Sequence, residues 1–156
     1  MEFDFKYIRL AIFLARKVVG TTFPNPAVFS LVVESNKELK DHKIINFGYT
    51  AITGRPHAES YALKGLNFKS KKFYTLYSTL EPCCHEGRSE SCVDKILRSK
   101  IDRVVFSILD PDPRVNGKGM KILKKNGIKV ISGLLKNEAF KLYEGYFFNR
   151  IPKRPK

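Results

Sequence analysis

The chain carries the stretch Pro56-His57-Ala58-Glu59, followed later by Pro82-Cys83-Cys84-His85-Glu86-Gly87-Arg88-Ser89-Glu90-Ser91-Cys92. Imidazole and thiolate groups are the ligands that zinc prefers in proteins. A catalytic zinc ion takes three protein ligands and leaves its fourth tetrahedral position open for water. We therefore predict that His57, Cys83 and Cys92 hold one zinc ion per chain, and that the carboxylate of Glu59 faces the open position.

Each of these residues also has an ordinary structural interpretation. A single histidine in a helix is usually structural, and a single cysteine usually fills a small space in the core. Three ligands and a carboxylate in one pattern favour the zinc site. A purely structural zinc ion would recruit a fourth ligand, for which Cys84 or His85 are the candidates.

The order His-x-Glu, then Pro-Cys and a second Cys, is typical of zinc deaminases. Many of these enzymes place two residues between the cysteines, whereas eight residues separate Cys83 from Cys92 here. We expect the longer loop to bring Arg88 beside the metal, where a guanidinium group could bind a phosphate with two parallel hydrogen bonds. The alternative for Arg88 is a solvated loop charge. In a deaminase, Glu59 would carry protons between water and a leaving amine.

The composition is that of a single globular domain in a reducing compartment. The 156 residues are 43% hydrophobic and 28% charged. The three cysteines are few and odd in number, which argues against a disulfide framework. No apolar run approaches the roughly 20 residues of a membrane span, and the N-terminus lacks the pattern of a signal peptide. We therefore predict a cytoplasmic protein that does not contact a membrane.

The net charge of +14 is strongly basic. Such a charge would attract anionic ligands, and it is also found in proteins that bind nucleic acids. A third explanation is that lysines simply solvate the surface. The basic residues are spread along the chain, apart from a cluster in the tail from Arg150 to Lys156.

The spacing of apolar residues predicts alternating helices and strands after an initial helix and hairpin. We expect helices at 4–19, 57–66, 91–99, 117–126 and 136–148, and strands at 28–34, 44–49, 73–80, 103–109 and 128–132. Asp4 is expected to cap the first helix and Gly20 to end it. This order predicts an α/β fold with parallel strands and helices on both faces of the sheet.

Ligands of such folds bind at the carboxyl ends of the strands. The strand at 73–80 leads directly to Cys83, so Cys83 is expected at that edge of the sheet. Helices that begin at His57 and near Cys92 could reach the same edge. The predicted topology therefore permits all three zinc ligands to meet.

Several segments then match one known pattern along nearly the whole chain, up to about Arg150. They are Pro24-Asn25-Pro26, Gly48-Tyr49, Pro56-His57-Ala58-Glu59, Thr79-Leu80-Glu81-Pro82-Cys83, Gly87-Arg88, Cys92, Asp110-Pro111-Asp112-Pro113 and Gly117-Lys118-Gly119. Together they resemble the pyrimidine deaminase domain of riboflavin biosynthesis. The resemblance implies a cytidine-deaminase-like fold, a three-layer α/β/α sandwich around a mixed five-stranded sheet. It also implies hydrolytic deamination of a diamino-hydroxy-pyrimidine that carries a ribosylamino 5′-phosphate.

The resemblance further implies which residues would contact this substrate. Asn25 would contact the pyrimidine, His85 and Arg88 would lie along the ribose phosphate, and Asp110 and Asp112 would line the same pocket. Deaminases of this fold commonly associate, so a homodimer or homotetramer is expected. Residues 1–150 would form the deaminase domain, and the basic tail 151–156 resembles the linker to a reductase domain that this chain lacks.

Four departures from the family pattern leave the exact substrate open. The family usually has Gly at Phe29, His at Thr50, two prolines at Glu90-Ser91 and Asn at Asp112. A carboxylate at Asp112 would repel a phosphate. Two alternatives therefore remain: a deaminase of tRNA or of nucleosides, which the basic charge favours, and a catalytically impaired zinc-binding paralogue, which the departures favour.

Overall fold

The computed structural model describes residues 2–22, 24–84 and 90–150. Its centre is a sheet with the strand order β2-β1-β3-β4-β5. The strands are β1 (Phe29–Ser35), β2 (Lys43–Tyr49), β3 (Phe73–Leu80), β4 (Arg103–Ile108) and β5 (Lys129–Ser132). Strand β1 runs antiparallel to both β2 and β3, whereas β3, β4 and β5 are parallel. The mixed five-stranded sheet is the predicted one.

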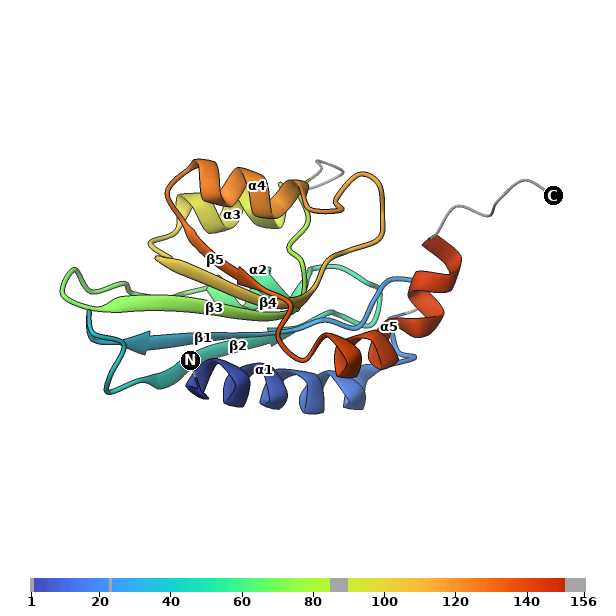
Figure 1. The fold of residues 1–156 in the computed structure, drawn as a ribbon, viewed down its shortest axis with the longest axis horizontal. Coiled ribbons are helices and arrows are strands. Elements are labelled where there is room, and N and C mark those ends of the chain that lie inside the picture. The colour runs from blue at the N-terminus through green and yellow to red at the C-terminus, as the bar shows by residue number, and fades with distance from the viewer. Residues whose placement is uncertain (1, 23, 85–89, 151–156) are drawn as a thin grey trace.

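Helices cover both faces of this sheet (Figure 1). Helix α1 (Glu2–Ala15), extended by the 3₁₀ helix η1 (Arg16–Val18), lies with α5 (Lys136–Arg150) on one face. Helices α2 (Ala58–Leu63), α3 (Cys92–Arg98) and α4 (Lys118–Lys125) lie on the other. The predicted three-layer arrangement is therefore confirmed. Among the described helices, none has the length and hydropathy that crossing a bilayer requires.

The central strands are buried on both faces because each face meets helices. In β1, Leu31 and Val33 pack into the core under α1 and α5, while Val32 packs into the core on the opposite face. In β3, Tyr77 and Leu76 divide between the two cores in the same way. This alternation follows from the two-residue period of a strand, and it explains why these strands read as continuous apolar runs.

The prediction that Asp4 caps the first helix is wrong. Asp4 lies inside α1, fully buried, and its carboxylate accepts hydrogen bonds from Nη1 and Nη2 of Arg103 at 3.1 and 2.8 Å. The hydroxyl of Tyr77 donates a further hydrogen bond to it. A buried guanidinium group is costly without a partner. Asp4 therefore serves as the counterion of Arg103 and ties α1 to the sheet.

Candidate metal centre and substrate cavity

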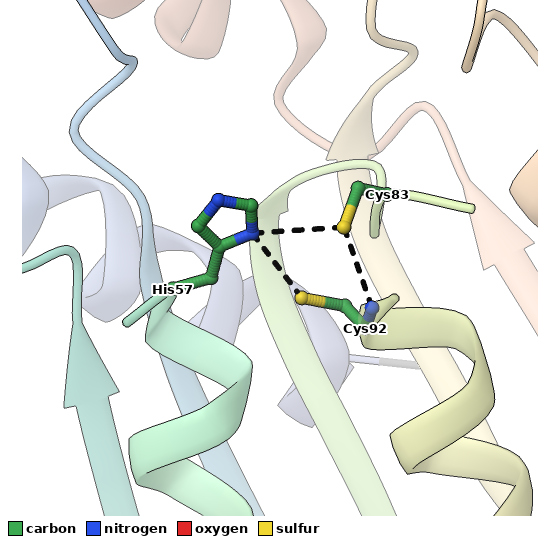
Figure 2. Close-up of side chains that lie close together, drawn as sticks. All are labelled: His57, Cys83 and Cys92. Atoms are coloured by element: carbon green, nitrogen blue, oxygen red, sulfur yellow. Dashed lines mark hydrogen bonds between the residues drawn. The ribbon is translucent and has the colours of Figure 1, made fainter. Parts of the chain in front are cut away.

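Three separate elements bring the predicted zinc ligands together. His57 is the N-cap residue of α2, Cys92 is the first residue of α3, and Cys83 follows the carboxyl end of β3. Ser91 starts α3 at this point, because its Oγ accepts a hydrogen bond from the N–H of Asp94 at 3.1 Å. Figure 2 shows the imidazole of His57 turned toward both sulfurs.

The distances between the ligand atoms fit a tetrahedral zinc site. Nδ1 of His57 lies 3.6 Å from Sγ of Cys83 and 3.4 Å from Sγ of Cys92. Bonds of about 2.0–2.1 Å to nitrogen and 2.3 Å to sulfur, at a tetrahedral angle, would separate these atoms by about 3.6 Å. All three ligand atoms lie within 4.8 Å of one another. The donor set and its spacing therefore suit zinc.

Glu59 lies in the first turn of α2, and its carboxylate is buried beside the ligands. Ser78 donates a hydrogen bond to Oε1 at 3.4 Å, and the thiol of Cys92 donates one to Oε2 at 3.4 Å. Burial raises the pKa of Glu59, and the nearby His57 opposes this effect. The carboxyl group therefore lies beside the candidate metal ligands, with a pKa above the ordinary value of a glutamate.

The pKa values of the two thiols shift in opposite directions. A hydrogen bond with the Cys92 side chain, helped by His57, lowers the pKa of Cys83 to about 4. The same interaction and burial raise the pKa of Cys92. The hydrogen bond to Cys83 raises the pKa of His57. Cys83 is therefore a thiolate at neutral pH, which is the form that binds zinc.

Cys84 does not join this cluster. Its thiol donates a hydrogen bond to the backbone carbonyl of Arg114 at 3.3 Å. Among the described residues, the metal-binding group consists of His57, Cys83 and Cys92. His85, the other candidate for a fourth ligand, lies outside the described residues, as does the predicted phosphate contact Arg88.

A cavity of about 130 Å³ opens beside the metal ligands. His57, Glu59 and Cys83 form part of its wall. Three residues that the family resemblance implies as substrate contacts, namely Asn25, Asp110 and Asp112, line the same cavity. The structure thus brings the described members of the predicted site together in one place.

Asn25 reaches this cavity from the loop before β1. Thr22 fixes that loop, since its carbonyl accepts the N–H of Asn25 at 2.9 Å and its hydroxyl donates to the carbonyl of Asn25 at 2.8 Å. Gly54 leaves room for the amide, because a Cβ atom at Gly54 would lie 2.0 Å from Nδ2 of Asn25. Gly54 also has a φ of +84°, which favours glycine.

Glu81 is an important residue of the cavity to which the sequence analysis assigned no role. Its Oε1 accepts hydrogen bonds from the N–H groups of Asp110 at 3.2 Å and Gly117 at 3.0 Å, and Oε2 accepts one from Met120 at 3.3 Å. It therefore holds the loop between β4 and α4, which carries Asp110 and Asp112. The available signal was a carboxylate placed directly after a strongly apolar strand.

Two departures from the family pattern have local explanations. Asp112 pairs with Arg114, whose Nε and Nη2 donate to the carboxylate at 3.0 and 2.7 Å. The charge that we expected to repel a phosphate is thereby balanced. Thr50 supports the start of β1, because its Oγ1 accepts the N–H of Val28 at 3.0 Å.

Comparison with known proteins is consistent with this geometry. Residues 1–108 match the family described as the cytidine and deoxycytidylate deaminase zinc-binding region. The diaminohydroxyphosphoribosylamino-pyrimidine deaminase of Buchnera aphidicola subsp. Acyrthosiphon pisum is 39% identical over 148 residues, which are 95% of this chain and 95% of the relative. The chain belongs to the deaminase family of riboflavin biosynthesis.

Other members of this deaminase family are much longer. The riboflavin biosynthesis protein RibD of Aquifex aeolicus is 45% identical over 154 residues, which are 99% of this chain but 41% of the relative. A RibD structure from Acinetobacter baumannii superposes with a TM-score of 0.83 at 36% identity, covering 94% of this chain and 40% of that chain. The chain thus spans about two fifths of these relatives, and its fold is the cytidine-deaminase-like fold.

Proposed function

We propose that this chain catalyses the zinc-dependent hydrolytic deamination of a phosphorylated aminopyrimidine in riboflavin biosynthesis. The observation that carries the proposal is the convergence of His57, Cys83 and Cys92 on one point beside the buried carboxylate of Glu59. The name of the Buchnera relative supports the substrate class, a diaminohydroxyphosphoribosylamino-pyrimidine. One zinc ion per chain is proposed, because the described residues contain one such ligand group.

In this mechanism the residues of the chain position water and move protons. A zinc ion held by His57, Cys83 and Cys92 would act as a Lewis acid and would lower the pKa of a nearby water molecule toward about 7. Glu59 accepts a proton as this water attacks the ring carbon that bears the amine. It then donates the proton to the departing nitrogen, so that ammonia leaves. The second proton of the water moves to the adjacent ring nitrogen, and a ring carbonyl remains. A raised pKa suits this role, because Glu59 must hold the proton between the two transfers.

The substrate contacts remain proposals. Asn25 presents an amide to the cavity and would bind an edge of the pyrimidine, while Asp110 and Asp112 would line the same pocket. His85 and Arg88 are proposed on the ribose phosphate side from the family resemblance alone.

Substitution of Glu59 by Gln tests the function. We expect ammonia release from the phosphorylated pyrimidine to fall by about 10²- to 10⁴-fold, because general acid–base catalysis typically contributes this much. Zinc content, measured by metal analysis, should be unchanged. The exposed Glu38→Gln variant is the matched control. If Glu59→Gln deaminates at the parent rate, the proton transfer role is wrong.

The same assay separates the alternatives. Free cytidine and a tRNA anticodon arm should release no ammonia if the pyrimidine phosphate is the substrate. Turnover of either instead would favour the nucleoside or tRNA deaminase. A zinc-loaded chain that deaminates none of the three would favour the impaired paralogue.

We also propose that copies of the chain associate as a dimer or tetramer. Apolar side chains exposed along β2 and the loop after it support this, namely Phe47, Tyr49 and Ile52, the last of which is 78% exposed. Light scattering tests it, and a monomer at micromolar concentration would refute it.

The proposed deaminase unit is residues 1–150, with 151–156 as a linker-like segment, which the 95% coverage of the Buchnera relative supports. A cytoplasmic location is part of the proposal, because thiolate ligands persist in a reducing compartment. Limited proteolysis tests the unit: cleavage within 2–84 rather than near residue 151 would contradict it.

A further inference from the structure

The guanidinium group of Arg114 is held in one orientation at the cavity wall. Arg114 follows β4 in the loop that Glu81 anchors, and its Nε and Nη2 donate to Asp112 at 3.0 and 2.7 Å. The N–H of Arg114 donates to Oδ1 of the same carboxylate at 2.9 Å. The side chain of Asp112 is 8% exposed, whereas that of Arg114 is 59% exposed. Asp112 is thus a buried brace that leaves the other edge of the guanidinium group open.

This arrangement leaves hydrogen-bond donors for a ligand. In the part of the chain that the structure describes, the side-chain hydrogen bonds of Arg114 run from Nε and Nη2, and Nη1 is not among the donors. Arg114 lines the same cavity as His57 and Glu59. A planar guanidinium group fits phosphate oxygens with two parallel hydrogen bonds. A phosphorylated ligand with its ring at the metal could therefore meet Arg114.

The carboxylates of the cavity wall make such directed donors important. Glu81 accepts hydrogen bonds from three backbone N–H groups, and Asp112 is paired with Arg114. The Asp112–Arg114 pair has no net charge, so it does not attract a phosphate over a long distance. It would bind a phosphate through hydrogen-bond donors that are held in a fixed orientation. The net charge of +14 on the whole chain supplies that attraction.

We propose that Arg114, oriented by Asp112, binds the phosphate of the substrate at the mouth of the cavity. This inference rests on the proposed function and assigns a phosphate contact to a residue outside the family motif. Arg114 is a binding residue that touches the substrate. Asp112 is a positioning residue that acts through Arg114.

Comparison of the phosphorylated pyrimidine with the same compound after phosphatase treatment tests the proposal. For Arg114→Gln, kcat/KM should fall by about 10- to 100-fold with the phosphorylated compound, as expected for losing hydrogen bonds between charged groups. It should change less than about 2-fold with the dephosphorylated compound. Arg98→Gln is the matched control, since Arg98 at the end of α3 pairs with Glu90 and does not line the cavity. An equal fall with both compounds, or no fall with either, overturns the proposal.

A double-mutant cycle tests the role of Asp112. Asp112→Ala should lower kcat/KM for the phosphorylated compound only while Arg114 is present. The double variant should therefore have the same kcat/KM as Arg114→Gln. Additive losses would contradict a role through Arg114.

A binding measurement keeps this test separate from the proposed function. If the parent chain deaminates neither compound, the proposed function fails. Titration of ribose 5-phosphate, followed by NMR, then still tests Arg114 directly. Binding that is as tight in Arg114→Gln as in the parent would refute the phosphate contact.

Discussion

Two of the buried carboxylates that line the cavity, Glu59 and Glu81, have different hydrogen-bond partners and therefore different roles. Glu59 accepts hydrogen bonds from the side chains of Ser78 and Cys92 and lies against the metal ligands. Glu81 accepts three hydrogen bonds from backbone N–H groups, which cannot move without moving the loop. Burial raises the pKa of both; His57 opposes this rise in Glu59, and the backbone hydrogen bonds oppose it in Glu81. Glu59 is therefore suited to exchange a proton, and Glu81 to fix a loop.

Glu81→Gln should show this anchoring role. In the glutamine, an NH2 group replaces one of the two carboxylate oxygens that accept backbone N–H groups. At least one hydrogen bond is therefore lost, and two donors face each other. We expect the free energy of unfolding to fall by about 2–3 kcal/mol, measured by urea denaturation. KM should also rise, because the loop carries Asp110 and Arg114. Unchanged stability and KM would show that the loop does not depend on Glu81.

The candidate metal ligands were easier to predict from the sequence than the residues that hold the cavity loops in place. His57, Cys83 and Cys92 could be proposed because zinc restricts the ligand types and leaves a recognisable order in the sequence. Glu81 has no such restriction, and one of its partners lies 29 residues away along the chain. The proposed role of Arg114 likewise depends on its ion pair with Asp112, which the sequence alone did not indicate.

At the scale of elements, α5 supports two of the loops that line the cavity. The hydroxyl of Tyr143 donates to the carbonyl of Ala27 at 2.9 Å, directly after the loop that carries Asn25. One turn later, the hydroxyl of Tyr146 donates to the carboxylate of Asp110 at 3.2 Å. Residues three apart lie on one face of a helix. Helix α5 therefore links the position of Asn25 to that of Asp110.

Removing the hydroxyl of Tyr143 should mainly lower stability, whereas removing that of Tyr146 should mainly raise KM. Tyr143 is fully buried, so Tyr143→Phe should lower the free energy of unfolding by about 1–3 kcal/mol. Tyr146 is half-buried at the cavity, so Tyr146→Phe should change stability by less than about 1 kcal/mol and raise KM several-fold. Thermal unfolding and steady-state kinetics of both variants check this. A Tyr146→Phe variant that loses stability with an unchanged KM would contradict the positioning role.

The sequence predicted elements well where the apolar pattern alone decides them. Strand β3 has the predicted bounds, because its residues are apolar or small and Pro82 follows closely. The start of α1 was misjudged, because the pattern of a helix cap does not reveal that Arg103 will be buried opposite Asp4. A partner distant in sequence again explains the failure.

Over the whole molecule, the metal site joins parts that the sheet alone does not hold together. Its ligands come from the start of α2, the end of β3 and the start of α3. Helices α2 and α3 pack on the same face of the sheet, and their first turns come together where His57 faces Cys92. An ion bound by all three segments would stabilise the folded chain, because the unfolded chain does not hold the ligands at these distances.

Removal of zinc should therefore lower the melting temperature as well as activity. A ligand present at about 1,000 times its dissociation constant stabilises a protein by about 4 kcal/mol. A domain of this size shifts by roughly 2–4 °C per kcal/mol, so chelation should lower Tm by roughly 10 °C in differential scanning fluorimetry. His57→Ala is the control, and its Tm should not respond to the chelator, since a ligand is already missing. An equal fall in both proteins would place the ion elsewhere, and no fall in the parent would mean that these three ligands contribute no metal-dependent stability.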